Sequence, residues 1–247
     1  MMYEGMIAET VRIWGNECDQ IDTYIARPLG KGPFPGVVLI HHMPGWDEGQ
    51  KEIARKFAYH GYICIAPNLH HRMGLGDIDD AVAAVRAAGG TPDAQFLGDF
   101  RGAIHYLKSL PYHNGKIGCI GFCSGGRQAY IAACNVPELD TAIDCWGGKV
   151  VMEPADISER QPISPIEMTS QMNCSLLGIF GNEDSSPSIQ EVNEIESTLQ
   201  KHKKKYQFFR YDGAGHAFVN SYRPSYRPEQ ALDAWGKIFN WLQNSLM

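Results

Sequence analysis

The stretch KIGCIGFCSGGRQA, residues 116–129, decides how the chain is interpreted. Its apolar run IGCIGF is typical of a buried strand, and a glycine-rich turn and a helical pattern follow. A strand that reverses sharply into a helix holds its apex residue at strained backbone angles and excludes side chains two positions away. Gly121 and Gly125 stand at those two positions around Cys123. A turn centred on Ser124 would have a bulky residue at the first of them, so the glycines favour Cys123 as the apex. Besides Cys123 or Ser124 as a nucleophile, a third interpretation is that the segment is only a tight strand-to-helix turn with no catalytic role.

Short apolar runs alternate with helical patterns along the whole chain. The expected strands are 8–14, 22–26, 36–40, 62–66, 117–122, 141–146, 176–180 and 206–211. The expected helices are 49–59, 78–88, 93–109, 125–133, 188–202 and 228–246. The first two strands alternate in polarity and favour an antiparallel hairpin, whereas the later runs suit parallel strands buried on both faces. The pattern predicts an α/β fold with a mostly parallel sheet of about eight strands and helices on both faces.

The composition indicates one globular α/β domain over residues 1–247, with 44% hydrophobic and 20% charged residues. A net charge of -6 gives no reason to expect nucleic acid or an anionic membrane as a partner. We find neither a signal-peptide pattern at the N-terminus nor an apolar stretch of ~20 residues. The seven cysteines are scattered, several of them inside apolar runs, as expected for reduced thiols in a cytoplasmic protein.

The least regular part of the chain is residues 149–173, which we interpret as a surface excursion that could cover part of a site. Its role stays open at this point. So does the oligomeric state, for which a homodimer is one alternative.

Three residues with the chemistry of a catalytic triad each follow a predicted strand, where open α/β sheets bind ligands. They are Cys123, Asp184 and His216, in the chain order of nucleophile, acid and histidine found in α/β-hydrolases. The imidazole of His216 would pair with the thiol, and Asp184 would fix its tautomer. Glu183 and Asp212 are alternative carboxylates, for which solvated turn residues are the competing interpretation.

The turn around Cys123 also offers the means to activate a thiol and to stabilise a negative charge. Amides at a helix N-terminus and an adjacent imidazole both lower the pKa of a cysteine. We expect two backbone N–H groups, those of Ser124 and of Met43 in the loop after strand 36–40, to form an oxyanion hole.

These residues resemble the dienelactone hydrolase family (carboxymethylenebutenolidases), which are single-domain α/β-hydrolases with a Cys–His–Asp triad. The matching pieces are GFCSGG around Cys123, GNED around Asp184 and GAGHAF around His216, together with GVVLIHHMPG, GYICIAPNL and LPYHNGKIGCIGF. The resemblance spans roughly residues 5–245. It implies hydrolysis of a small-molecule ester or lactone through a thioester intermediate, without a metal or an organic cofactor.

Two positions depart from the family pattern and favour an altered substrate specificity. His42 stands where members that act on dienelactone have a glutamate near the thiol, and Asn220 replaces an arginine that binds the substrate carboxylate. The candidate substrate-binding residues are His42, Trp146, Asn220 and Arg127. For Arg127, a solvated surface charge is the competing interpretation.

Other histidines and other functions remain as alternatives. His41, His42, His70 and His71 follow two strands and could suggest a metal site. Adjacent strand residues point to opposite faces and no zinc motif is present, so no metal is predicted. A non-enzymatic small-molecule binder on the same fold is a second function. A redox sensor based on Cys123 is a third, although no resolving thiol stands at a suitable spacing.

Overall fold

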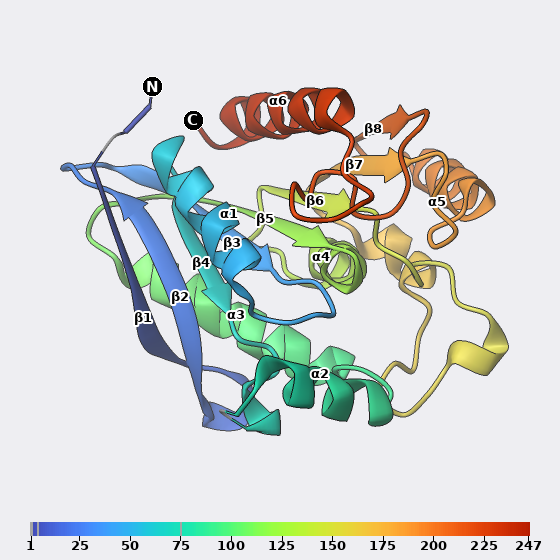
Figure 1. The fold of residues 1–247 in the computed structure, drawn as a ribbon, viewed down its shortest axis with the longest axis horizontal. Helices are drawn as coiled ribbons and strands as arrows, with labels where there is room; N and C mark the ends of the chain where they lie inside the picture. The colour runs from blue at the N-terminus through green and yellow to red at the C-terminus, as the bar shows by residue number, and fades with distance from the viewer. Residues whose placement is uncertain (1, 4, 75) are drawn as a thin grey trace. The chain divides into compact units, whose positions relative to one another are not determined.

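The computed structural model describes residues 2–3, 5–74 and 76–247 of the chain (Figure 1). Contacts divide the chain into two compact units, which are described separately below. The first unit comprises Met1–Cys119 with Ser158–Arg160, and the second comprises Ile120–Ile157 with Gln161–Met247. That residues 1–247 form a single domain stays a prediction.

The first unit holds a mixed sheet in the order β1-β2-β4-β3-β5. Its strands are β1 (Met6–Trp14), β2 (Gln20–Pro28), β3 (Phe34–Ile40), β4 (Ile63–Pro67) and most of β5 (His113–Phe122). β1 and β2 form the predicted antiparallel hairpin, from Met6 opposite Pro28 to Trp14 opposite Gln20. β2 is antiparallel to β4, and β3 is parallel to β4. The sheet therefore changes from antiparallel to parallel within this unit.

The described residues of the first unit form the α-helices α1 (Glu48–Tyr59), α2 (Ile78–Ala87) and α3 (Asp93–Ser109). α1 and α3 cover opposite faces of its sheet (Figure 1). Asp47 caps α1 by accepting a hydrogen bond from the backbone N–H of Gln50, a residue type and spacing typical of a helix start. α3 buries Phe96, Phe100 and Leu107, which recur at helical spacing and form part of the core.

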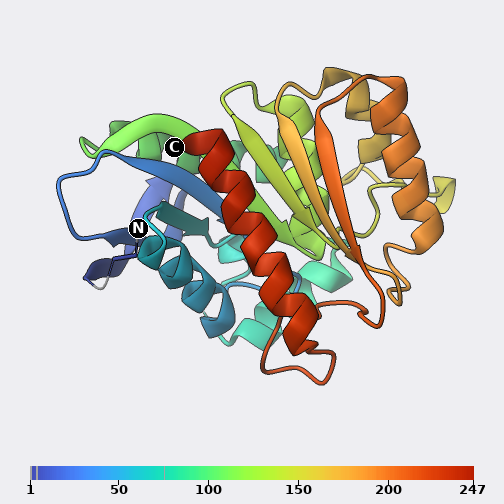
Figure 2. The same cartoon turned by 90° about the horizontal axis from the view of Figure 1, so that it is seen from above.

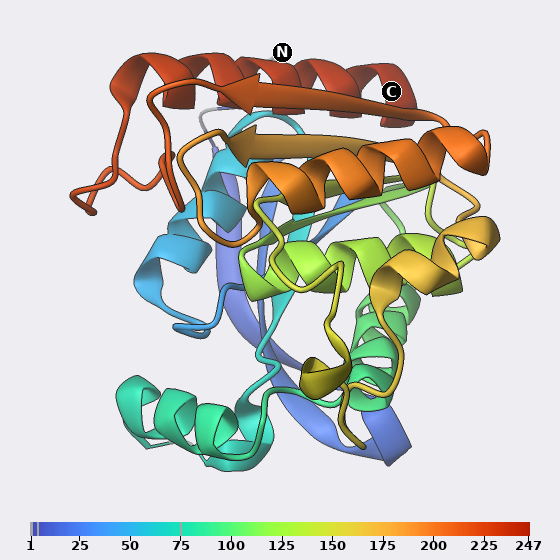
Figure 3. The same cartoon turned by 90° about the vertical axis from the view of Figure 1, so that its right-hand side faces the viewer.

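The second unit continues the sheet from the end of β5 in the order β5-β6-β7-β8. Its further strands are β6 (Thr141–Cys145), β7 (Ser175–Gly181) and β8 (Tyr206–Tyr211), and both β6–β7 and β7–β8 pair in parallel. Its helices are α4 (Ser124–Asn135), α5 (Ile189–Lys201) and α6 (Pro228–Leu246). β7 and β8 lie between α5 and α6 (Figures 2 and 3). α4 lies on the same side of these strands as α5 (Figure 3).

Every predicted strand and α-helix occurs in the described residues, and the predicted mostly parallel, eight-stranded sheet with helices is confirmed. Helices 93–109 and 228–246 have the predicted bounds. The strand predicted to reach Trp146 ends at Cys145 because Trp146 has a φ of 45°, outside the strand region. No helix among the described residues has both the length and the apolar character needed to cross a membrane.

The segment 149–173 is more tightly packed than a plain surface excursion. It contains two short 3₁₀ helices, Pro154–Asp156 and Pro165–Gln171. The second contacts α4 and α5. Ser164 is buried, and its hydroxyl accepts a hydrogen bond from the Met152 N–H and donates one to the Val150 carbonyl. These hydrogen bonds join two parts of the segment to each other, and its second 3₁₀ helix contacts α4 and α5, a packing that its irregular sequence did not indicate.

Candidate active site

The turn between β5 and α4 has the strained geometry that its glycines indicated. Cys123 has φ 57° and ψ -119°, and it is the N-cap residue of α4. A Cβ atom added to Gly121 would overlap the carbonyl oxygen of Gly125, so a side chain there cannot be accommodated without moving the backbone. Ser124 is the first residue of the helix itself. The apex of the turn is therefore Cys123, whose thiol is partly exposed, whereas Cys119 is fully buried in β5.

The start of α4 packs closely on the end of β6, with no space for side chains between them. Asp144 in β6 is buried, and its Oδ1 accepts a hydrogen bond from the Gly147 N–H at 2.8 Å. A Cβ added to Gly126 would overlap that same oxygen. Burial raises the pKa of Asp144 to about 7, although the Gly147 hydrogen bond acts in the opposite direction. Asp144 thus fixes the turn at Gly147 against the helix that begins at the thiol, and its role was not foreseen from the sequence.

His216 and Asp184 form a close pair within the same unit as Cys123. The Nδ1 atom of His216 lies 2.8 Å from Oδ2 of Asp184. The carboxylate side chain is 2% exposed and the imidazole 39%. Oδ1 of Asp184 also accepts a hydrogen bond from the Ser186 N–H at 3.0 Å, so both carboxylate oxygens are bound and the side chain cannot turn freely. Asp184 is held in the position needed to orient the imidazole.

His216 also interacts with the thiol. Burial lowers the pKa of His216, but hydrogen bonds to the side chains of Asp184 and Cys123, and the negative charges of both, outweigh burial and raise it to about 10. Hence the imidazole is held in its charged form at neutral pH, between a carboxylate and the sulfur. The structure brings together the three residues predicted as a triad; their catalytic roles stay a prediction.

The two alternative carboxylates, Glu183 and Asp212, are exposed to solvent. Glu183 is exposed, and its backbone N–H donates to the Ala214 carbonyl. Asp212 is also exposed, and its carboxylate accepts a hydrogen bond from the side chain of Asn182. Of the three carboxylates, His216 is bonded to Asp184.

An aromatic cluster supports the imidazole. Trp146 is 1% exposed, and its ring lies edge-on to His216 with the centroids 6.4 Å apart. Phe122 and Phe218 pack on the same indole at 5.5 and 5.4 Å. Trp146 thus forms part of the packed wall behind the histidine, and its predicted contact with substrate stays a prediction.

The other two candidate substrate-binding residues of the second unit are buried as well. Arg127 is 4% exposed, so the interpretation as a solvated surface charge is wrong. Its guanidinium donates to the Lys149 carbonyl and contacts the sulfur of Met152, which ties α4 to the segment after β6. Asn220 is 6% exposed and lies in the tight turns after His216, where its N–H donates to the Ala217 carbonyl. Their burial was not visible from residue type alone.

In the first unit, the loop after β3 holds the remaining candidates, His42 and Met43. His42 is 4% exposed, and its Nε2 lies 2.7 Å from Oδ2 of Asp47. Burial raises the pKa of Asp47, but the hydrogen bond to His42 and the histidine's charge outweigh this and lower it. Asp47 was missed at the sequence level, although its position just before α1 marks it as a helix cap.

The neighbouring His41 makes hydrogen bonds to the backbone with both of its ring nitrogens. His41 is buried, its Nδ1 lies 2.8 Å from the His42 carbonyl oxygen, and its Nε2 accepts from the Leu69 N–H. Burial lowers the pKa of His41 well below its ordinary value, and nearby His70 acts in the same direction. In the described part of the chain, no three His, Cys, Asp or Glu side chains are grouped as metal ligands would be.

Comparison with known proteins finds relatives that match almost the entire chain. The model of the dienelactone hydrolase family matches residues 21–246. The chain is 31% identical over 244 residues to a protein of Methylorubrum extorquens named "Putative carboxymethylenebutenolidase", covering 97% of this chain and 81% of that protein. It is 28% identical to a protein of Bradyrhizobium named "Probable 2-oxo-3-(5-oxofuran-2-ylidene)propanoate lactonase", covering 89% and 88%.

A solved structure shows the same fold. The crystal structure titled "Putative Dienelactone Hydrolase" from Klebsiella pneumoniae superposes with a TM-score of 0.88 at 28% identity, covering 97% of this chain and 99% of that one. The sheet and helices described above are therefore those of the α/β-hydrolase fold, and the chain is a dienelactone hydrolase-like hydrolase. On the family match and the shared fold together, this chain belongs to the dienelactone hydrolase family.

Proposed function

We propose that the protein hydrolyses small lactones or esters, with Cys123 as the nucleophile, His216 as the acid and base, and Asp184 as the group that orients the histidine. One observation carries the proposal: His216 is hydrogen-bonded to both Asp184 and Cys123, and its pKa is raised to about 10. A histidine that stays protonated beside a cysteine favours a thiolate–imidazolium pair, and the thiolate is the reactive form of cysteine.

In the first half of the reaction, the Cys123 thiolate attacks the carbonyl carbon of the substrate. A C–S bond forms, and the carbonyl electron pair moves onto oxygen. When the tetrahedral intermediate collapses, the C–O bond to the leaving oxygen breaks, and that oxygen takes the proton from the His216 imidazolium. The product of this half is a thioester, with His216 neutral.

In the second half, neutral His216 takes a proton from water as the water oxygen attacks the thioester carbonyl. The C–S bond then breaks, the carboxylic acid is released, and the thiolate–imidazolium pair is restored. Asp184 keeps Nδ1 of the ring occupied throughout, so that Nε2 exchanges the proton in both halves.

The negative charge on the carbonyl oxygen requires hydrogen-bond donors. Ser124 begins α4, and its N–H belongs to the first helical turn, where backbone donors have no partner inside the helix. We assign this N–H to the oxyanion hole. Losing one such donor typically costs ~3 kcal/mol of transition-state stabilisation.

The substrate class follows from the relatives and from the chemistry of the nucleophile. Two of them carry the names of a carboxymethylenebutenolidase and a lactonase. A thiolate expels an enolate or another stabilised oxygen leaving group readily, which suits lactones and activated esters. We propose that His42 and Asn220, which the resemblance to the family places at positions that recognise substrate, give this protein a specificity different from that for dienelactone.

The test compares aryl-ester and enol-lactone hydrolysis by the wild type, Cys123→Ala and Ser124→Ala, with iodoacetamide alkylation of Cys123 followed by mass spectrometry. We expect Cys123→Ala to lose at least about 10⁴-fold in kcat, as happens when a triad nucleophile is removed. Ser124→Ala should retain activity, because its contribution is a backbone N–H. Activity that survives in Cys123→Ala and disappears in Ser124→Ala would overturn the assignment.

A further inference from the structure

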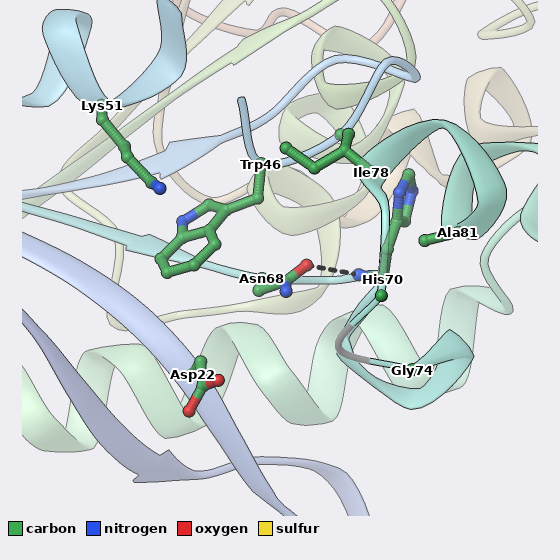
Figure 4. A pocket seen from close by; sticks show the side chains of 10 residues that line it. Asp22, Trp46, Lys51, Asn68, His70, Gly74, Ile78 and Ala81 are labelled. Carbon is green, nitrogen blue, oxygen red and sulfur yellow. Dashed lines mark hydrogen bonds between the residues drawn. The ribbon is translucent and has the colours of Figure 1, made fainter. Parts of the chain in front are cut away.

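A cavity of about 200 Å³ lies within the first unit, among residues to which the proposed reaction gives no role (Figure 4). Trp46, Ile78 and Ala81 give it apolar walls, and Lys51, Asn68 and His70 provide polar groups. An apolar protein cavity of ~150 Å³ accommodates benzene, so this one is large enough for a single-ring molecule. Mostly apolar walls with a few converging polar groups are typical of small-molecule sites.

His70 contributes an unsatisfied polar atom to this cavity. The residue is 6% exposed, and its Nδ1 is buried without a hydrogen-bond partner. That nitrogen lies close to Gly45: a Cβ added to the glycine would be only 3.2 Å from it, so a larger residue there would crowd the nitrogen. Leaving such a group unpaired costs roughly 1–3 kcal/mol, which a ligand bonded to it would recover.

The protonation state of His70 determines whether Nδ1 can donate a hydrogen bond. Burial lowers its pKa to about 4, and the charge of His42 acts in the same direction. At neutral pH one ring nitrogen carries a proton and the other does not. With the proton on Nδ1, His70 would donate a hydrogen bond to a ligand oxygen. Asn68, whose Oδ1 already accepts from the His70 backbone N–H, has its amide NH₂ available as a second donor.

Lys51 supplies a positive charge on the Trp46 side of the same cavity. Its Nζ lies 4.3 Å from the centroid of the Trp46 ring, and among the described residues it makes no ion pair. Figure 4 shows the two side chains next to each other. The cavity also has a carboxylate, Asp22, but that charge is paired with Arg12 at 3.1 Å. The charge left for a ligand is therefore positive.

We propose that this cavity is a binding site for a small planar carboxylate, such as an acid with one aromatic ring. The ring would lie in the apolar part against Trp46 and Ile78. The carboxylate would bind Lys51, and Nδ1 of His70, which lies on the other side of Trp46 from Lys51 in Figure 4, would donate a hydrogen bond to a further oxygen of the ligand.

The inference goes beyond the proposed function, since none of the residues involved is given a part in the reaction of Cys123. It is therefore tested by binding instead of turnover. Benzoate is the probe, benzamide its neutral counterpart of the same shape, and isothermal titration calorimetry the measurement. Parallel titrations of the wild type and Cys123→Ala keep the outcome separate from hydrolysis: benzoate should bind both equally.

Two variants locate the site, and a third is the control. Lys51→Met removes the charge and retains the side-chain length, and we expect benzoate affinity to fall about tenfold. Ala81→Phe fills the cavity from α2 without removing a polar group, and should abolish binding. Lys56→Met removes an exposed lysine of the same helix α1 as Lys51, outside the cavity, and should change nothing. Circular dichroism and thermal melts establish that each variant is folded.

The proposal fails under three results. Benzoate binding that is unchanged in both Lys51→Met and Ala81→Phe would place the ligand elsewhere, for example at the triad. Equal affinity for benzamide and benzoate would show that the charge of Lys51 is not used. Absence of benzoate binding to the folded wild type at millimolar concentration would show that the cavity is not a carboxylate site.

Discussion

Two histidines, one in each unit, lie in loops that follow a strand, and their environments move their proton equilibria in opposite directions. His216, after β8, has a ring that is 39% exposed and hydrogen bonds to two partners that can carry negative charge; its pKa is raised to about 10. His70, after β4, is 6% exposed with Nδ1 unpaired, and burial lowers its pKa to about 4.

The difference shows that partners, more than depth of burial, decide which form of an imidazole the fold stabilises. Burial lowers the pKa of both rings. Only at His216 do hydrogen bonds to Asp184 and Cys123 reverse the outcome. One histidine is therefore suited to hold a thiolate, and the other to act as a neutral donor at neutral pH.

Removing the partner that distinguishes His216 should have the largest effect. In Asp184→Asn the imidazole loses the negative charge and the acceptor that fix its tautomer, and we expect kcat for an aryl ester to fall about 10⁴-fold. The rate of Cys123 alkylation by iodoacetamide at pH 7 should fall as well. Glu183→Gln, a change of the adjacent exposed carboxylate, is the matched control and should stay within about twofold of the wild type. An equal loss in both variants would contradict the pairing.

A second experiment measures how strictly the backbone of the turn at Cys123 is fixed. Gly121→Ala places a methyl group onto the Gly125 carbonyl oxygen, and we expect a loss of more than about 3 kcal/mol in the free energy of unfolding. Gly236→Ala, inside α6, meets no atom within 4 Å and should stabilise the protein by roughly 0.5–1 kcal/mol, since alanine favours a helix. Urea denaturation measures both, and similar effects of the two changes would disprove the steric argument.

The smallest effects, and the most direct test of the comparison, are opposite dependences of stability on pH. The pKa of His70 is lower in the folded protein than its ordinary 6.5, so the unfolded chain takes up the proton first. The stability from its neutral form is present above pH 6.5 and is lost as the pH falls towards 4. At pH 5 the loss should be roughly 2 kcal/mol, and His70→Leu should remove most of it.

The pKa of His216 is raised, so the sign reverses. The stability from its charged form is fully present below pH 6.5 and is lost as the pH rises towards 10. Because the ring is 39% exposed and solvent screens it, the change should be on the order of 1 kcal/mol or less. Urea denaturation of the wild type, His70→Leu and His216→Gln at pH 5, 7 and 9 measures the loss of stability on both the acid and the alkaline side. If His216→Gln lost as much stability between pH 7 and pH 9 as the wild type, the assigned ion pair would not exist in solution.

The sequence predicted well whatever depends on local pattern. Helix 228–246 could be delimited because Pro228 suits a first helical turn and the apolar positions after it recur at helical spacing. The glycines at 121 and 125 identified the apex of the turn because backbone sterics act over two residues. The proximity of Asp184 and His216 could be inferred from their positions after parallel strands, whose ends lie at one edge of a sheet.

Features that depend on tertiary packing could not be predicted from the local sequence pattern. β5 begins at His113, four residues before the predicted start, in the polar segment HNGK that does not look like a buried strand. Arg127 looked like a surface charge, but the fold buries it and supplies a carbonyl for its guanidinium. The unpaired nitrogen of His70 and the position of Lys51 over Trp46 depend on contacts between different elements, and no local pattern records them.

The positive φ of Cys123 has a consequence for how such proteins diversify. The turn selects its apex residue by backbone shape and by the small volume next to it, and it sets no condition on whether the nucleophilic atom is sulfur or oxygen. Thiol and hydroxyl side chains of the same length satisfy it equally, whereas a β-branched residue does not. The scaffold therefore permits one nucleophile to be exchanged for the other by a single substitution, and later changes in the surrounding loops can adapt the new chemistry without rebuilding the fold.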